Sequence, residues 1–423
     1  MRAMGTPRRT SSSGALRRPP SGAVATSERR RRREAARRAA YRRRRLRALG
    51  LIAALAAIAG AAVGSGAGSE GGGGAQPVAS FCDPERSDLA RAAGQGVMVR
   101  MELRATDELR RQARSGEIGG VVLFPPEDAR GERLAAEIAA LQEEAARGGN
   151  PPLLVAIDQE GGIVERLPAL APQLSPYTLA QNDDPRSARL EGRAAGFQLH
   201  ELGVNVDLAP VLDVPESAEH WMTPRAFGST PEQVSRLGLR FAGGLQSEGV
   251  AATAKHFPGL GRAPENTDYA PTTVDASARE LRADMEPFAA AIRRGVRLVM
   301  MSSAAYPTLG SRDPAVLSPQ VVGGELRERL GFDGVVISDD LLAPAVATAA
   351  DRSEAAVRAA AAGVDVLLFA RKHVRGVAAA LVRAVQAGEL DEAAVRASCA
   401  RVESLKRELA AERPLAAPAE GSS

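Results

Sequence analysis

Three apolar segments of the sequence each end on a cluster of polar side chains that could carry out chemistry. They are residues 152–158 (PLLVAID), 250–256 (VAATAKH) and 332–339 (FDGVVISD). The clusters supply carboxylates, an ammonium group and an imidazole, which are groups that acid–base and nucleophilic catalysis use. Because parallel strands bring their carboxyl ends to one face of a barrel, we expect the three clusters to form one active site.

The pattern around these segments predicts the elements that position them. Apolar runs that we expect to be strands cover residues 96–101, 118–124, 153–158, 204–214, 250–256, 298–303, 334–339 and 364–370. Helices are expected in stretches that include residues 131–146, 231–248, 277–294, 353–362 and 391–411. Near-continuous apolar strands separated by helices indicate a parallel sheet covered on both faces. Eight such strands predict an α/β fold with a single (β/α)8 TIM-type barrel. The alternative is a doubly wound sheet, but no G-x-G-x-x-G motif follows the first strand.

Charge divides the chain into two parts. Residues 1–66 contain 17 Arg and 2 Glu, so the remainder, with 38 basic and 49 acidic residues, carries a net charge of −11. An acidic folded part argues against nucleic acid as a partner. The predicted order is a basic tail (1–47), a transmembrane or signal segment (48–64), a Gly-rich linker (65–87), the barrel (88–411) and a polar tail (412–423).

The uncharged segment 48–64 directly follows residues 29–47, in which 12 of 19 residues are Arg. Basic residues before an apolar segment predict a cytoplasmic tail and an exported remainder. We therefore expect a membrane anchor, which would place the catalytic domain outside the cytoplasm at the cell membrane. A cleaved signal peptide, which would make the protein secreted, is one alternative. An RNA-binding tail beside an Ala-rich helix is another.

The chain contains two cysteines, Cys82 and Cys399, one before the first expected strand and one in the last expected helix. The chain ends of a closed barrel lie close together, and export would permit oxidation, so we expect a disulfide between them. The alternative is two unrelated buried thiols. Neither cysteine has the spacing of a metal site, and we expect neither a metal nor an organic cofactor.

Five short motifs lie at or near the ends of the expected strands. They are residues 158–162 (DQEGG) with Arg166, 209–213 (APVLD), 225–228 (RAFG), 255–259 (KHFPG) and 338–341 (SDDL). With these motifs the chain resembles glycoside hydrolase family 3, in its single-barrel β-N-acetylglucosaminidase branch, over residues 88–410. The resemblance implies a retaining β-glycosidase that removes terminal non-reducing sugars from cell-wall glycans, such as peptidoglycan fragments, without a cofactor.

The resemblance also implies roles for individual residues. Asp339 is the expected nucleophile, which would form a glycosyl-enzyme intermediate that water then hydrolyses. Sugar-binding roles are implied for Asp158, Arg166, Arg225, Lys255 and His256. Structural alternatives remain, since Asp339 could lie at a helix N-cap, a role that suits Asp340 better. Asp158 could likewise lie at the centre of a salt-bridge network, and His256 could be a packed core residue.

The chain departs from the family pattern in the loop that should carry the proton donor. The family places an Asp-His dyad there, whereas this chain has Asn266 and Asp268 at those positions. Two other histidines of the family pattern are replaced by Leu260 and Ser303, and an arginine is replaced by Ile163. A carboxylic acid is the proton donor of most glycosidases, so we expect Asp268 to take that role.

Three functions are compatible with this altered loop. The first is an active hydrolase in which Asp268, or Glu265 in the same loop, donates the proton. The second is a catalytically impaired relative that binds sugar at the cell envelope, because loss of a general acid slows turnover by about 10²–10⁴-fold. The third is a phosphorylase, for which Arg262 is the only hint. The expected partners are a carbohydrate substrate and, through the N-terminal segment, the membrane.

Overall fold

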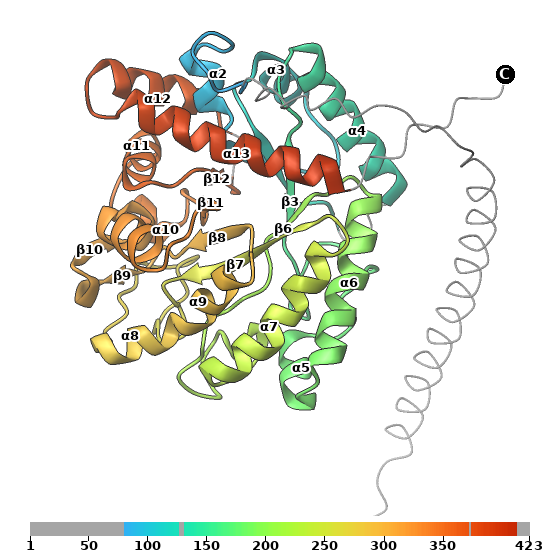
Figure 1. The fold of residues 1–423 in the computed structure, drawn as a ribbon, viewed down its shortest axis with the longest axis vertical. Coiled ribbons are helices and arrows are strands. Elements are labelled where there is room, and N and C mark those ends of the chain that lie inside the picture. Colours follow the sequence, from blue (N-terminus) through green and yellow to red (C-terminus); the bar gives the residue numbers. More distant parts are fainter. Residues whose placement is uncertain (1–79, 127–130, 372–373, 413–423) are drawn as a thin grey trace, which may run out of the picture. The chain divides into compact units, whose positions relative to one another are not determined.

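The computed structural model describes residues 80–126, 131–371 and 374–412. Within this part, eight parallel strands form one sheet in the order β11-β8-β7-β6-β3-β2-β1-β12 (Figure 1). A bridge between Ile337 of β11 and Val366, directly before β12, brings the two edges of this sheet together. The predicted (β/α)8 barrel is therefore confirmed.

Each barrel strand overlaps one of the expected runs. The strands are β1 (Val97–Met101), β2 (Gly120–Leu123), β3 (Leu154–Ile157), β6 (Val206–Asp207), β7 (Ala251–Phe257), β8 (Leu298–Met301), β11 (Val335–Ser338) and β12 (Leu367–Phe369). The largest difference is β6, which has two residues where the apolar run 204–214 predicted a long strand. Pro210 lies in this run and has no N–H to donate to a neighbouring strand, although its carbonyl accepts from the Lys255 amide at 3.2 Å.

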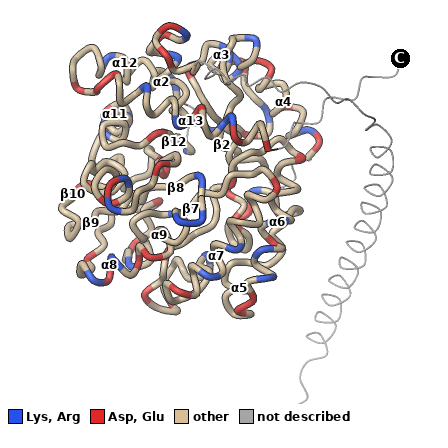
Figure 2. Tube along the Cα trace, in the orientation of Figure 1, with Lys and Arg blue, Asp and Glu red and all other residues tan. Residues whose placement is uncertain are grey.

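The helices cover the outside of the barrel (Figure 1). They are α2 (Leu89–Gly94), α3 (Asp107–Ser115), α4 (Gly131–Arg147), α5 (Pro176–Asn182), α6 (Pro185–Glu201), α7 (Pro231–Gln246), α8 (Ala278–Asp284), α9 (Glu286–Arg293), α10 (Pro344–Ala347), α11 (Arg352–Ala362), α12 (Val377–Gln386) and α13 (Glu392–Glu412), with a π-helix at Gln320–Arg329. Figure 2 shows basic and acidic residues interspersed along these helices. Neighbours such as Arg147 and Glu143 form ion pairs there.

The single helix expected over residues 277–294 is two helices, α8 and α9. A capping box between Ser277 and Glu280 begins α8. Pro287 lies in the first turn of α9, where its missing N–H has no helical partner to lose. Inside one continuous helix the same residue would remove a hydrogen bond and clash with the preceding turn, so the helix ends before it.

The last helix closes one end of the barrel. Val402 and Leu405 of α13 pack among side chains of the barrel interior such as Met98 and Ile337. The Nζ of Lys406 donates to Gln95 just before β1, and Arg401 pairs with Asp365 just before β12. These partners precede their strands, so α13 covers the amino ends of the strands and leaves the carboxyl ends to other elements.

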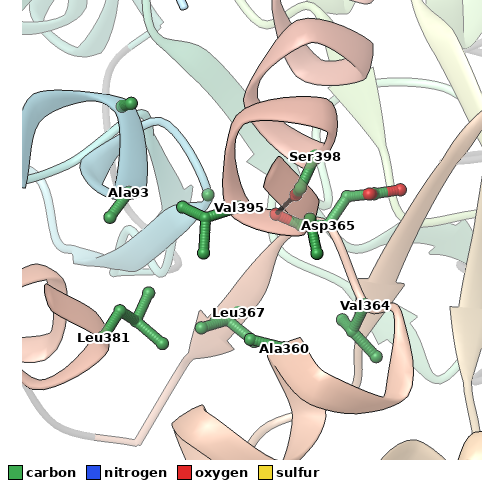
Figure 3. Close-up of a pocket in the computed structure, with 11 residues that line it drawn as sticks. Ala93, Ala360, Val364, Asp365, Leu367, Leu381, Val395 and Ser398 are labelled. Carbon is green, nitrogen blue, oxygen red and sulfur yellow. Dashed lines mark hydrogen bonds between the residues drawn. The ribbon is translucent and has the colours of Figure 1, made fainter. Parts of the chain in front are cut away.

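A disulfide joins Cys82 to Cys399 of α13, with their Cα atoms 5.8 Å apart. Arg396, also on α13, donates to the carbonyl of Cys82 at 2.9 Å. The segment before α2 is thus attached covalently to the closing helix. A cavity of about 30 Å³ lies close by, between α2, α11, α12 and α13 (Figure 3). It is room for one or two water molecules at the amino ends of the strands, so it is no part of the expected active site.

Two short hairpins extend the carboxyl ends of the strands. One, β4 (Gln159–Gly161) with β5 (Val164–Glu165), follows β3, and the other, β9 (Ala305–Tyr306) with β10 (Ser311–Pro314), follows β8. The predicted anchor or signal segment 48–64 lies outside the described residues. In the part of the chain that the structure describes, no helix combines the length and the apolar composition needed to cross a bilayer.

Candidate active site

The carboxyl ends of β3 and β7 meet around one buried ammonium group, that of Lys255. Its Nζ donates to Asp158 Oδ1 at 2.9 Å and to Glu160 Oε1 at 2.6 Å. Arg225 donates to both oxygens of Glu160, at 2.7 Å from Nη2 and 2.9 Å from Nε. An unpaired buried ammonium group would be strongly unfavourable, and the two carboxylates offset that cost. The salt-bridge network considered for Asp158 is therefore present, with Lys255 at its centre.

Electrostatics keep the carboxylates of this network ionised. Burial would raise the pKa of Glu160, but Arg225 and Lys255 outweigh burial and lower it to about 2. Burial also opposes ionisation of Asp158, and Lys255 with Arg166 reverses the effect, so the pKa of Asp158 lies below its usual value. At neutral pH both groups are hydrogen-bond acceptors of the kind that bind sugar hydroxyls.

Arg166 lies beside this network, at the end of the β4–β5 hairpin. Its Nη2 is 3.4 Å from Asp158 Oδ2. Its guanidinium stacks on the ring of Phe124 at 4.4 Å, and Arg100 lies over the same ring at 4.2 Å. The Arg166 Nε is buried and has no hydrogen-bond partner in the described part of the chain. This side chain therefore has a fixed position and an unused donor.

Asp207 of β6 is buried on the outer face of the sheet, because it is in register with Ile157 of β3 and Ala252 of β7, which pack between the strands and the helices. Its Oδ1 accepts from the Gln159 amide at 3.0 Å, and its Oδ2 has no partner among the described residues. Burial raises the pKa of Asp207 well above its usual value. Asp207 is thus favoured in its neutral form, and it is separate from the ion-paired carboxylates around Lys255.

His256 is oriented by Asp213. The imidazole Nδ1 lies 2.7 Å from Asp213 Oδ2. Asp213 Oδ1 accepts from the backbone amides of His256 at 3.1 Å and Leu260 at 2.7 Å, which fixes the carboxylate. The other ring nitrogen, Nε2, has no partner among the residues that the structure describes, so it can bind a ligand. His256 is buried, yet it is not a simple core residue, because its ring is held by a carboxylate.

Asp339 follows β11 at the same end of the barrel and is partly accessible. Its Oδ1 accepts from the Asp340 amide at 2.8 Å. Burial raises the pKa of Asp339, while His256 lowers it and Asp268 raises it further. The influence of His256 and Asp268 on this pKa places both side chains in the electrostatic neighbourhood of Asp339. The structure thus brings together the predicted nucleophile, the predicted proton donor and the histidine.

Neither Asp339 nor Asp340 caps a helix, because α10 begins only at Pro344 and its N-cap is Ala343. Asp340 instead stabilises the turn after β11, where its Oδ1 accepts from Leu342 at 3.1 Å and from Ala370 at 3.0 Å. Burial raises the pKa of Asp340 to about 6. The expectation of a helix cap was wrong because the chain makes a turn across to β12 before it becomes helical.

The loop after β7 places its polar residues in different environments. Asp268 is about half exposed and pairs with Arg371, which follows β12. Glu265 is exposed at the surface. Arg262 pairs with Asp284 at 2.7 Å, so the guanidinium that suggested a phosphorylase is already occupied by a carboxylate.

The other departures from the family pattern are of two kinds. Leu260 and Ser303 are buried, and the Ser303 hydroxyl has no partner among the described residues. Ile163 is 68% exposed at the tip of the β4–β5 hairpin. Leu260 packs in the hydrophobic core, so it offers no polar group in place of the family's histidine.

Sequence reasoning assigned no role to three residues that the structure places in the site. They are Glu160, Asp213 and Arg371. Glu160 lies in the motif 158–162 and Asp213 in the motif 209–213, and the position of these acidic residues at or near strand ends was the available signal. Nothing in the sequence around Arg371 pointed to Asp268, because the two are 103 positions apart.

Comparison with known proteins identifies the domain. Residues 89–405 match the model of the glycosyl hydrolase family 3 N terminal domain. A protein of Arthroderma benhamiae named an uncharacterized secreted glycosyl hydrolase is 34% identical over 335 residues, which are 77% of this chain and 95% of that protein. The β-hexosaminidase LpqI of Mycobacterium tuberculosis is 35% identical over 301 residues, 68% of this chain and 76% of LpqI.

Solved structures resemble the same region. A family 3 β-N-acetylglucosaminidase from a Paenibacillus species superposes with a TM-score of 0.75 at 35% identity, and the match covers 80% of this chain and 65% of that one. A β-N-acetylhexosaminidase from Beutenbergia cavernae superposes with a TM-score of 0.70 at 33% identity, over 76% of this chain and 99% of that one. This chain therefore spans about two thirds of the first enzyme and nearly all of the second.

Proposed function

Because the chain belongs to glycosyl hydrolase family 3, we propose that it is a retaining β-N-acetylhexosaminidase whose nucleophile is Asp339. The observation that carries the proposal is the position of Asp339, which is partly accessible at the strand ends beside His256 and the Lys255 network. Relatives named β-hexosaminidases favour an enzyme over the sugar-binding alternative. A carboxylate in this place can attack the anomeric carbon of a bound sugar.

The reaction has two steps, and each uses the residues in a different way. In the first step the Asp339 carboxylate forms a bond to the anomeric carbon while Asp268 gives its proton to the departing glycosidic oxygen. In the second step Asp268 removes a proton from water, whose oxygen displaces Asp339 and releases the sugar. His256 and Lys255 lower the pKa of Asp339 against the effect of burial, and this favours the ionised nucleophile.

The remaining residues bind the sugar. Asp158 accepts hydrogen bonds from sugar hydroxyls, and Lys255 donates to hydroxyl oxygens beside it. The Nε2 atom of His256, whose ring contacts Asp213 through Nδ1, donates to or accepts from the sugar. Arg166 donates through the accessible part of its guanidinium, since its side chain is 35% exposed. Arg225 is fixed by Glu160, so its main contribution is to orient that carboxylate and, through it, Lys255.

The natural substrate we propose is a cell-wall glycan or a fragment of one, and the catalytic domain is residues 88–411. Two observations support action outside the cytoplasm, namely the disulfide of the closing helix and the relative described as secreted. Disulfides persist in oxidising compartments. Residues 48–64 then serve as the membrane anchor or cleaved signal that exports the domain.

The test is hydrolysis of 4-nitrophenyl β-N-acetylglucosaminide and 4-nitrophenyl β-glucoside by the purified full-length chain. We expect turnover of the first substrate, faster than of the second, and its loss in Asp339→Ala. Asp333→Ala is the matched control, because Asp333 is an exposed residue before the same strand, at its other end. An Asp339→Ala variant that retained wild-type turnover would refute the assignment. A wild type that binds N-acetylglucosamine in calorimetry but turns over neither substrate would indicate the sugar-binding alternative.

A further inference from the structure

We propose that Arg371 is a positioning residue that links the proton donor to the nucleophile strand, an inference that rests on the function proposed above. The feature behind it is one guanidinium that contacts two carboxylates from different elements. Its Nη2 donates to Asp268 Oδ1 at 3.0 Å and to the Asp268 carbonyl at 2.7 Å. Its Nε lies 3.1 Å from Asp340 Oδ2.

The Asp340 end of this link is rigid. The amide of Ala370 donates to Asp340 Oδ1 at 3.0 Å, so two consecutive residues after β12 hold the same carboxylate. The amide of Asp340 in turn donates to Asp339 Oδ1 at 2.8 Å. Asp268, Arg371, Asp340 and Asp339 thus form a continuous chain of contacts from the proton donor to the nucleophile.

The position of Asp268, at the other end of the link, depends more strongly on its contact with Arg371. Asp268 is about half accessible and Tyr269 is 80% accessible, although Thr267 directly before them is buried. Local contacts such as the one from the Asp268 amide to Asn266 Oδ1 at 2.9 Å shape the turn, but they do not attach it to the barrel. Arg371 contacts both the side chain and the backbone of Asp268, and it therefore sets where the turn lies over the strand ends.

The negative charges around the nucleophile give a second reason for the contact of Arg371 with Asp268 and Asp340. Asp268 disfavours ionisation of Asp339, so the carboxylates of Asp268, Asp339 and Asp340 repel one another when they are ionised. A fixed cation between Asp268 and Asp340 offsets this repulsion when Asp268 is ionised. When Asp268 is protonated for donation, the Arg371 contact to its carbonyl at 2.7 Å still holds the turn. Without Arg371 we expect the Asp268 turn to move away from the nucleophile, and a displacement of about 1 Å can slow proton transfer by about 10²-fold.

Proton donation is needed most when the leaving group is poor. A defect in proton donation therefore lowers kcat/KM more for a poor leaving group than for a good one, whereas loss of folded protein lowers both equally. We expect Arg371→Met to lower kcat/KM for an alkyl β-N-acetylglucosaminide by about 10–10²-fold. For the 2,4-dinitrophenyl glycoside, which departs without a proton, the expected loss is less than about threefold. Arg371→Lys keeps the charge but not the two-sided contact, so it should recover part of the loss.

The matched control is Arg358→Met, because Arg358 is also a partly accessible arginine that pairs with an aspartate, Asp313. It should leave both substrates unaffected. Urea unfolding of each variant reports the fraction folded. The second measurement is a double-mutant cycle of Arg371→Met with Asp268→Asn. In the Asp268→Asn background, Arg371→Met should lower kcat/KM for the alkyl substrate only slightly, because the two residues act as one unit.

Two results would overturn the inference while leaving the proposed function intact. One is an equal loss on both substrates in Arg371→Met, and the other is full additivity with Asp268→Asn. A wild type that hydrolyses neither glycoside would instead contradict the proposed function, and the inference would fall with it.

Discussion

Replacing Glu160 by Gln should destabilise the folded protein by about 3 kcal/mol at neutral pH, with a loss that shrinks on acidification. Glu160 is 1% exposed and is held by Arg225 and Lys255. Its pKa falls from 4.5 to about 2 on folding. This lowering of the pKa corresponds to about 3 kcal/mol of stabilisation by the ionised form. Gln has the same shape as Glu but carries no charge. In the variant, Asp158 would be the one carboxylate that still contacts Lys255 in this cluster.

The pH dependence distinguishes this cause from a packing defect. Because the pKa of Glu160 is lowered in the folded state, its stabilising effect is complete above pH 4.5 and is lost as the pH falls toward 2. The difference between wild type and Glu160→Gln should therefore decline by about 1 kcal/mol between pH 6 and pH 4. Urea unfolding followed by circular dichroism at several pH values measures it.

The matched control is Glu165→Gln in the same hairpin. Burial raises the pKa of Glu165, so its charge opposes folding at neutral pH and its removal should be neutral or slightly stabilising. A Glu160→Gln loss below about 0.5 kcal/mol at pH 7, or one of the same size at pH 4, would refute the electrostatic argument. The substitution should also raise KM, because Glu160 orients the lysine and arginine beside the sugar site.

Three further predictions concern the nucleophile, the histidine and the disulfide. Asp339→Ala should lower kcat by about 10⁴-fold or more while calorimetry still detects sugar binding; turnover within tenfold of wild type would contradict its role. Asp213→Asn should lower kcat by about 10–10²-fold because the acceptor that orients His256 is weakened, and unchanged kinetics would show that the pair is only structural. Replacing Cys82 and Cys399 by Ala should lower the free energy of unfolding by up to about 6 kcal/mol, from the entropy of a loop closed over 317 positions. The wild type should match this variant under reducing conditions, and a difference that survived reduction would point to packing instead.

Much of the fold could be predicted because a barrel strand is covered on both faces, and its sequence is therefore a near-continuous apolar run. The runs that ended on Asp158, His256 and Asp339 became β3, β7 and β11 with boundaries within two residues of those expected. The errors lay where a local residue competes with the pattern. Pro287 divides one expected helix into α8 and α9, and the run containing Pro210 is mostly irregular.

The sequence by itself determined which residue types stand at the strand ends, because motif spacing and strand period are local properties of the chain. Together with the resemblance to the family, it predicted a nucleophile, a set of sugar-binding residues and an altered proton-donor loop. Only the tertiary structure decided which charges pair. Lys255 contacts Glu160 across 95 positions and Arg371 contacts Asp268 across 103, and such contacts depend on barrel closure. For that reason a salt-bridge network at Asp158 could be considered from the sequence, but its partner Glu160 and the link through Arg371 came from the fold alone.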